Sequence, residues 1–129
     1  MALRARKLMW KRRDKMKGKI FYGATLALSV ACLGLVALIW RTPELLSFML
    51  IVNALALIAI GRSFKHGLLL FVLSGLLGAA AEAFAVGFGP WAYAFPEIFG
   101  VPFWLILVWG TSGVFLARMS GWIREWLKI

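Results

Sequence analysis

Four long apolar runs leave this chain few ways to fold. They cover residues 20–40, 45–60, 68–88 and 101–117, and each is close to the roughly 17 to 25 residues that a membrane-spanning helix requires. Only 16% of the residues are charged and 63% are hydrophobic, whereas a soluble domain has about 25% charged residues. Short connectors favour antiparallel neighbours. The sequence therefore predicts an all-α, polytopic membrane protein whose four transmembrane helices form an antiparallel bundle.

The basic residues predict how the bundle lies in the membrane. Nine of them fall in residues 1–19, two in 61–67 and three in 118–129, and Arg41 is the fifteenth. Lys and Arg of short loops are retained on the cytoplasmic side. Four spans place all of them except Arg41 on that side. We therefore expect a multi-pass protein of the inner (cytoplasmic) membrane, with both termini cytoplasmic and residues 89–100 outside.

Two polar segments flank the transmembrane domain, which covers residues 20–117. Residues 1–19 form a basic tail in a chain of formal charge +10, and we expect this tail to attract the anionic headgroups of the bilayer. An acidic protein partner is an alternative, and nucleic acid is a less favoured one. In residues 118–129, apolar side chains recur at the spacing of one helical face, which predicts an amphipathic interfacial helix.

Glu82 places a carboxyl group inside the third apolar run. Counting from Leu68 at about 1.5 Å per residue, it lies roughly 21 Å into a hydrocarbon layer about 30 Å thick. Asn53 and Trp109 fall near the same depth. Because no Lys or Arg lies at that level, we expect a protonated Glu82 with Asn53 as its hydrogen-bond donor. Such a residue is either part of a functional site or a structural hydrogen bond between helices.

Residues 89–100 contain glycines, prolines and aromatic residues that interrupt the helical pattern. Trp91 and Tyr93 fit an aromatic belt at the membrane surface. Alternatively, the segment folds back over Glu82 and closes a lipid-facing pocket with aromatic walls. His66 has no second metal ligand nearby, so the sequence predicts neither a metal site nor a cofactor.

The run "EAFAVGFGPWAYAFPEIFGVPFWLILVWG", residues 82–110, resembles a segment of carotenoid-biosynthesis membrane proteins of the carotenoid hydratase type. It is also similar to small uncharacterised prokaryotic membrane proteins. Chains of the hydratase type are longer and have more helices. The resemblance implies that Glu82 protonates a terminal isoprenoid double bond, that water then attacks the cation, and that Trp91 or Tyr93 shields the charge. It implies a framework of Phe88, Gly89, Tyr93, Gly100, Val101 and Pro102.

Two functions are consistent with these patterns. The first is binding of, or action on, an isoprenoid, a pigment or another lipid, with Glu82 as candidate catalytic acid and with Asn53, Trp91, Tyr93 and Trp109 as candidate ligand-binding residues. The second is a non-catalytic subunit or scaffold of a larger membrane complex or homo-oligomer. Small-residue faces favour the second; they are Gly23/Ala27/Ala31, Ser74/Gly78/Glu82 and Gly113/Ala117/Gly121. Whether the protein is an enzyme stays open.

Overall fold

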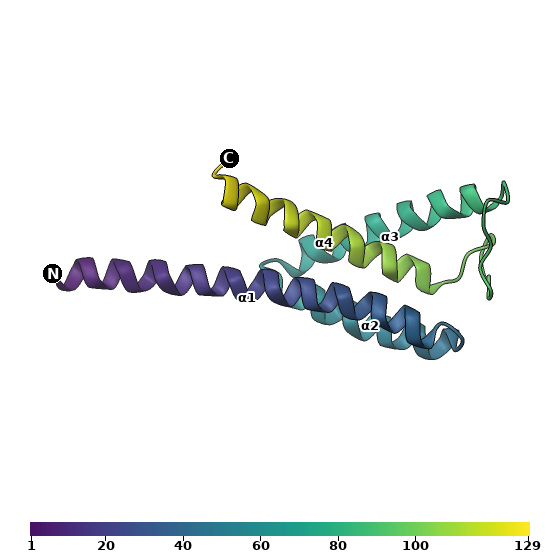
Figure 1. Cartoon of the computed structure of the whole chain (residues 1–129), viewed down its shortest axis with the longest axis horizontal. Helices are drawn as coiled ribbons and strands as arrows, with labels where there is room; N and C mark the ends of the chain where they lie inside the picture. The colour runs from purple at the N-terminus through teal and green to yellow at the C-terminus, as the bar shows by residue number, and fades with distance from the viewer.

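The computed structural model describes all 129 residues, which form four helices (Figure 1). They are α1 (Ala2–Ile39), α2 (Pro43–Ala59), α3 (Phe64–Val86) and α4 (Trp104–Leu127). Three of them, α1, α3 and α4, are long and apolar enough to cross a membrane, whereas α2 is a shorter apolar helix of 17 residues. The predicted all-α class and its apolar spanning helices are confirmed to this extent.

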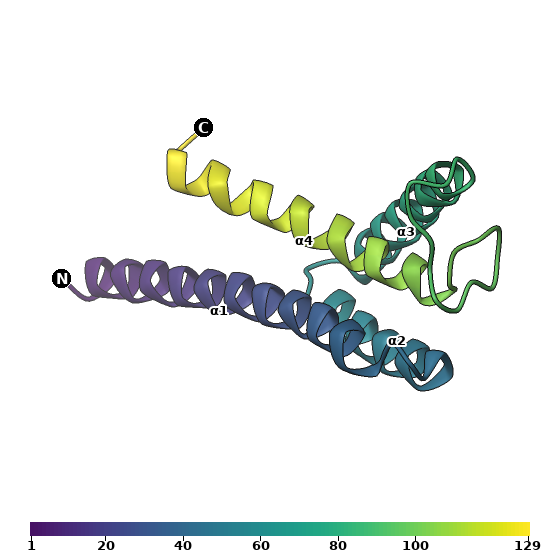
Figure 2. The same ribbon diagram turned by 45° about the vertical axis from the view of Figure 1, so that its right-hand side comes forward.

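The helices alternate in direction, so the connectors gather at two ends of the molecule. The α1–α2 connector and residues 87–103 lie at one end, called here the loop end (Figure 1). The two chain termini and the α2–α3 connector lie toward the other, called the terminal end. Helix α2 runs beside α1, and α3 makes its most extensive contacts with α4. Helices α1 and α4 diverge toward the terminal end (Figure 1), and Figure 2 shows α4 between α3 on one side and α1 with α2 on the other.

Local sequence explains where the helices begin and end. Pro43 is the first residue of α2, a position where its missing N–H costs no hydrogen bond. Ser63 caps α3, because its Oγ accepts a hydrogen bond from the backbone N–H of His66 at 3.2 Å. Helix α3 stops before Gly87, just ahead of Pro90. These signals fix the connectors at both ends of α2 and the start of the long loop.

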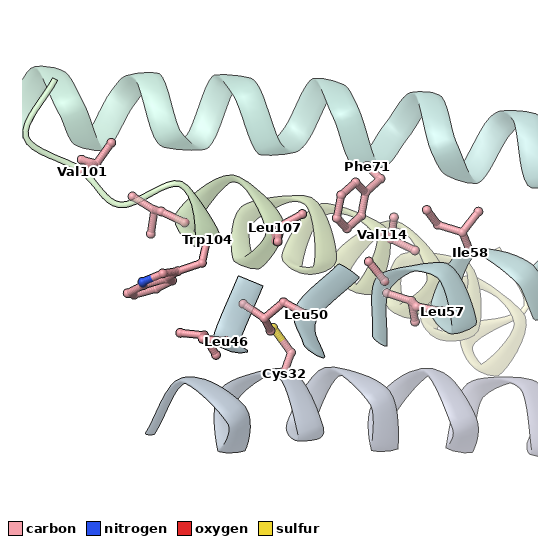
Figure 3. Packing of buried hydrophobic residues seen from close by; sticks show 12 residues of the cluster. Cys32, Leu46, Leu50, Leu57, Ile58, Phe71, Val101, Trp104, Leu107 and Val114 are labelled. Carbon is pink, nitrogen blue, oxygen red and sulfur yellow. The ribbon is translucent and has the colours of Figure 1, made fainter. Parts of the chain in front are cut away.

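A single apolar core joins α1, α2 and α4, with Phe71 contributed by α3 (Figure 3). Helix α2 supplies the largest share, because Leu46, Leu50 and Leu57 are almost fully buried. Outward-facing residues of the long helices are also apolar, as Leu38 and Leu77 show. This is the surface that spanning helices present to lipid. The core consists of Cys32, Leu46, Leu50, Ala54, Leu57, Ile58, Phe71, Val101, Trp104, Leu105, Leu107 and Val114.

Two helices are longer than the apolar runs that predict them. Helix α1 continues without a break through the basic tail, and α4 continues through the segment for which the sequence predicts a separate interfacial helix. Neither junction contains a proline, and the residues there are mostly good helix formers. The basic tail therefore extends the line of α1 (Figure 1), and residues 118–127 form the last turns of α4.

Candidate functional site

Glu82 lies near the end of α3 and accepts two hydrogen bonds. The indole Nε1 of Trp109, on α4, donates to Oε1 at 2.8 Å, and the hydroxyl of Tyr93, in the loop, donates to Oε2. One carboxyl group thus connects two helices and the loop between them. The protonated state of Glu82 that the sequence suggests stays a prediction.

Close packing of α3 against α4 places Trp109 beside Glu82. A Cβ atom on Gly78 would overlap the indole ring of Trp109, and one on Gly75 would come within 2.6 Å of the backbone oxygen of Ile106. Gly113 has the same relation to Ser74. The predicted packing face of Ser74, Gly78 and Glu82 is therefore used between α3 and α4. The absence of a side chain at Gly78 lets the indole approach α3 closely enough to donate to the carboxyl group.

A tight turn directs the loop back onto the bundle. Phe99 and Gly100 have φ values of 47° and 81°, as the two central residues of a type I′ turn require. The turn is closed by backbone hydrogen bonds between Ile98 and Val101, each 3.0 Å long. Val101 and the following proline are buried. The chain therefore re-enters the bundle immediately before α4, which holds residues 91–97 across the loop end.

Tyr93 connects Glu82 to an aromatic hollow at the loop end. Its hydroxyl donates to Glu82, and its ring contacts Trp104 edge-on with the ring centres 6.0 Å apart. Burial, and then the hydrogen bond to Glu82, raise the pKa of Tyr93 to about 12. The phenol therefore stays protonated, and able to donate, throughout the physiological range.

The hollow beside Tyr93 has a volume of about 200 Å³. Its walls are almost wholly apolar, and Trp40 and Phe95 close one side with ring centres 6.1 Å apart. Pockets that enclose a whole drug-sized ligand measure about 300 to 1,000 Å³, so this hollow admits one end of a chain. Its walls are formed by Trp40, Tyr93, Ala94, Phe95, Pro102 and Trp104.

The structure brings only some of the expected site residues together. Tyr93 and Trp109 contact Glu82, whereas Asn53 does not. The expected Asn53–Glu82 hydrogen bond is wrong, since Asn53 Nδ2 donates to the backbone oxygen of Leu28 at 3.1 Å and joins α2 to α1. Trp91 is about half exposed in the loop and is not part of the wall of the hollow. Asn53 therefore lies apart from the Glu82 network.

Three aromatic residues of the hollow, namely Trp40, Phe95 and Trp104, are not among the candidate site residues that the sequence predicts. Trp40 follows the last residue of α1, and Trp104 is the first residue of α4. Trp40 and Trp104 lie at helix ends at the same level. From the sequence alone, these positions indicate an aromatic belt at the membrane surface. Only the fold of the loop turns three separate aromatic residues into one concave surface.

No protein-family model, curated protein or solved structure matches this chain. Its function is therefore inferred from the geometry of the site.

Proposed function

We propose that this chain is a small inner-membrane protein that spans the bilayer four times, with both termini cytoplasmic, and binds one end of an isoprenoid or other long-chain lipid at the loop end. In this topology α2 is the shortest span, and the loop end faces away from the cytoplasm. The distribution of basic residues supports this orientation, because it places fourteen of the fifteen on the cytoplasmic side.

The observation that carries the proposal is the double role of Tyr93. The residue belongs to the wall of the aromatic hollow and also donates to Glu82. The hydrogen bond to Glu82, which does not line the hollow, thereby fixes the position of the Tyr93 side chain in its wall. Aromatic faces suit the unsaturated carbons of an isoprenoid, and the small volume suits a chain terminus whose remainder lies in lipid.

The position of the acid favours binding over proton transfer. Glu82 does not line the hollow, and the Tyr93 hydroxyl that lies between them is engaged with Glu82. A general acid must come within hydrogen-bond distance of the atom that it protonates. Glu82 is therefore proposed as a positioning residue, and the acid role that the carotenoid hydratase resemblance implies is the less supported form of the proposal.

Mass spectrometry of lipids that co-purify in mild detergent tests the proposal. We expect a long-chain lipid with the wild type and its loss from Phe95→Ala, which removes part of the wall. Phe84→Ala is the matched control, because Phe84 is an exposed aromatic residue on α3 that pairs with Phe88 outside the hollow. Equal retention by Phe95→Ala, Tyr93→Ala and the control would refute the assignment of the hollow.

Glu82→Gln separates positioning from acid chemistry. A glutamine has one acceptor oxygen for Trp109 and an NH2 group that can donate to the Tyr93 hydroxyl, so Tyr93 keeps a hydrogen bond and we expect this variant to retain the lipid. Glu97→Gln is its control, because Glu97 is a loop carboxylate that accepts only a long 3.4 Å bond from the backbone of Phe103. Conversion of the bound lipid by the wild type, lost in Glu82→Gln alone, would instead establish the acid role.

One observation favours the second function, a subunit or scaffold of a membrane complex. The small-residue face of α1 is exposed, and a Cβ atom on Gly23 would meet no atom within 4 Å. The corresponding glycines of α3 and α4 are used inside the molecule. If α1 packs against another membrane protein, Ala27→Leu will abolish cross-linking to it. Ala80→Leu, at another exposed alanine on α3, will leave the cross-linking unchanged.

A further inference from the structure

A second recess lies at the terminal end, on the opposite side of the molecule from Glu82. It is a cleft of about 910 Å³ between the first half of α1, the α2–α3 connector and the last turns of α4. Helices α1 and α4 diverge toward this end (Figure 1). A hydrogen bond from the Tyr22 hydroxyl to Glu125, 3.0 Å long, joins the two helices within the cleft.

The walls of the cleft carry more positive than negative charge. Lys15, Lys17 and Lys19 come from α1, and Arg62 comes from the connector. Two acidic residues also line it, and one of them, Glu125, already accepts the hydrogen bond from Tyr22. Four cations from two separate elements around one space form a site that favours an anion.

The same walls are apolar on the side that continues into the spanning helices. The polar part of α1 ends at Lys19, and its apolar run begins at Ile20. The end of α2 shows the same change between Ile60 and Arg62. Trp122 adds an aromatic wall from α4, and tryptophan prefers the headgroup level of a membrane. The occupant must therefore be amphipathic, with an anionic group beside an apolar one.

A partly buried arginine adds to the charge at the apolar border of the cleft. Arg118, on α4, donates to the hydroxyl of Thr25 at 3.3 Å and lies over the ring of Phe21 at 5.0 Å. Neither partner carries a charge that offsets the guanidinium. Phe21 itself lines the cleft, so this positive charge lies directly behind the cleft wall.

We propose that this cleft binds the phosphate headgroup of an anionic membrane phospholipid, whose acyl chains lie along the apolar surfaces of α1 and α4. The lysines and Arg62 contact the phosphate, and the aromatic residues lie at the level of the glycerol backbone. A lipid is favoured over a soluble phosphate compound because the cleft straddles the boundary between the basic and apolar parts of two helices.

Native mass spectrometry of the full chain in mild detergent tests this assignment with phosphatidylglycerol, phosphatidylcholine and glycerol 3-phosphate as probes. We expect the wild type to retain phosphatidylglycerol in preference to phosphatidylcholine, and glycerol 3-phosphate not to displace it. The triple variant Lys15→Gln, Lys19→Gln and Arg62→Gln should bind phosphatidylglycerol about a hundredfold more weakly. Each basic residue near a membrane surface contributes about 1 kcal/mol, which is roughly a fivefold change in affinity.

A second triple variant removes the same charge from the same end of the molecule without touching the cleft. It combines Lys65→Gln, Arg124→Gln and Lys128→Gln, three exposed residues that do not line the cleft. We expect it to bind within about threefold of the wild type, since long-range attraction alone is weak at physiological salt. Equal weakening by both triple variants would mean diffuse attraction and overturn the proposal.

Two further outcomes decide against the cleft or its occupant. Equal retention of phosphatidylcholine, or displacement by glycerol 3-phosphate, would overturn an anionic lipid as the ligand. Glu125→Gln provides a variant that gains affinity. It keeps an acceptor for Tyr22 but removes a negative charge, so we expect phosphatidylglycerol to bind about fivefold more tightly. An unchanged affinity in this variant would also contradict the proposed headgroup position.

Discussion

Gly78→Ala is the substitution that connects helix packing most directly to the Glu82 network. The new Cβ atom would overlap the indole ring of Trp109, whose Nε1 donates to Glu82 at 2.8 Å. The ring must move away from α3, because a Cβ atom on a helix cannot. The movement breaks the hydrogen bond between α4 and the carboxyl group, so one methyl group disturbs both the helix contact and the site.

The expected loss of stability follows from three contributions. Overpacking of an interior costs about 1 to 3 kcal/mol, and a side-chain hydrogen bond between membrane helices contributes about 0.6 kcal/mol and at most about 1.7 kcal/mol. Replacing glycine by alanine within a helix recovers about 0.5 to 1 kcal/mol. The free energy of unfolding should therefore fall by about 1 to 4 kcal/mol. In a Trp109→Ala background, Gly78→Ala should lose most of this penalty, because the ring that its Cβ atom would displace is absent.

Reversible unfolding in mixed micelles with increasing SDS measures these changes, with tryptophan fluorescence as the signal. Gly23→Ala is the matched control, because a Cβ atom at Gly23 meets no atom within 4 Å. We expect this control to be neutral or to stabilise by up to about 1 kcal/mol. If Gly78→Ala and Gly23→Ala have the same effect, α3 and α4 do not approach as described, and the geometry of the Glu82 network is refuted.

Three further predictions concern separate parts of the molecule. In Tyr22→Phe, where Tyr93 is the only remaining tyrosine, ultraviolet titration should show the phenol ionising near pH 12. Because this folded-state pKa is raised from 10.0, the contribution of Tyr93 to stability is complete below about pH 10 and is lost as the pH rises to about 12. Gly110→Ala places a Cβ atom 2.8 Å from the ring of Phe71, and SDS unfolding should show a loss of about 1 to 3 kcal/mol. Asn53→Ala should lower the free energy of unfolding by about 0.6 kcal/mol or somewhat more, since the Asn53 amide donates to a backbone oxygen of α1. Lipid retention should stay unchanged. Loss of the lipid would place Asn53 in the site.

The helices were the most predictable part of this chain. Apolar runs of spanning length directly indicate helices in lipid, because every backbone group must be satisfied within the segment. The small-residue spacing of α3 also predicted the face that carries Glu82. The outer limits of α1 and α4 were less predictable, since hydropathy marks where a helix leaves an apolar environment and carries little information on where the helix itself ends.

The partners of Glu82 could be predicted only in part. Depth arithmetic placed Trp109 near the right level, because rise per residue is nearly constant. It placed Asn53 at the same level but could not give the direction in which α2 turns its amide. Tyr93 belongs to an irregular loop, and its return to Glu82 depends on a turn at Phe99 and Gly100 that no periodicity reveals.

The unbroken length of α1 has an electrostatic consequence. At about 1.5 Å per residue its 38 residues extend roughly 57 Å, and Arg4 lies about 24 Å along the helix from Ile20. The Debye length at physiological ionic strength is only about 8 Å. Where α1 stands upright in the bilayer, only the last few basic residues before Ile20 sense the surface potential of the headgroups. The positive charge nearer the N-terminus is screened from the membrane, and in the proposed topology it extends into the cytosol.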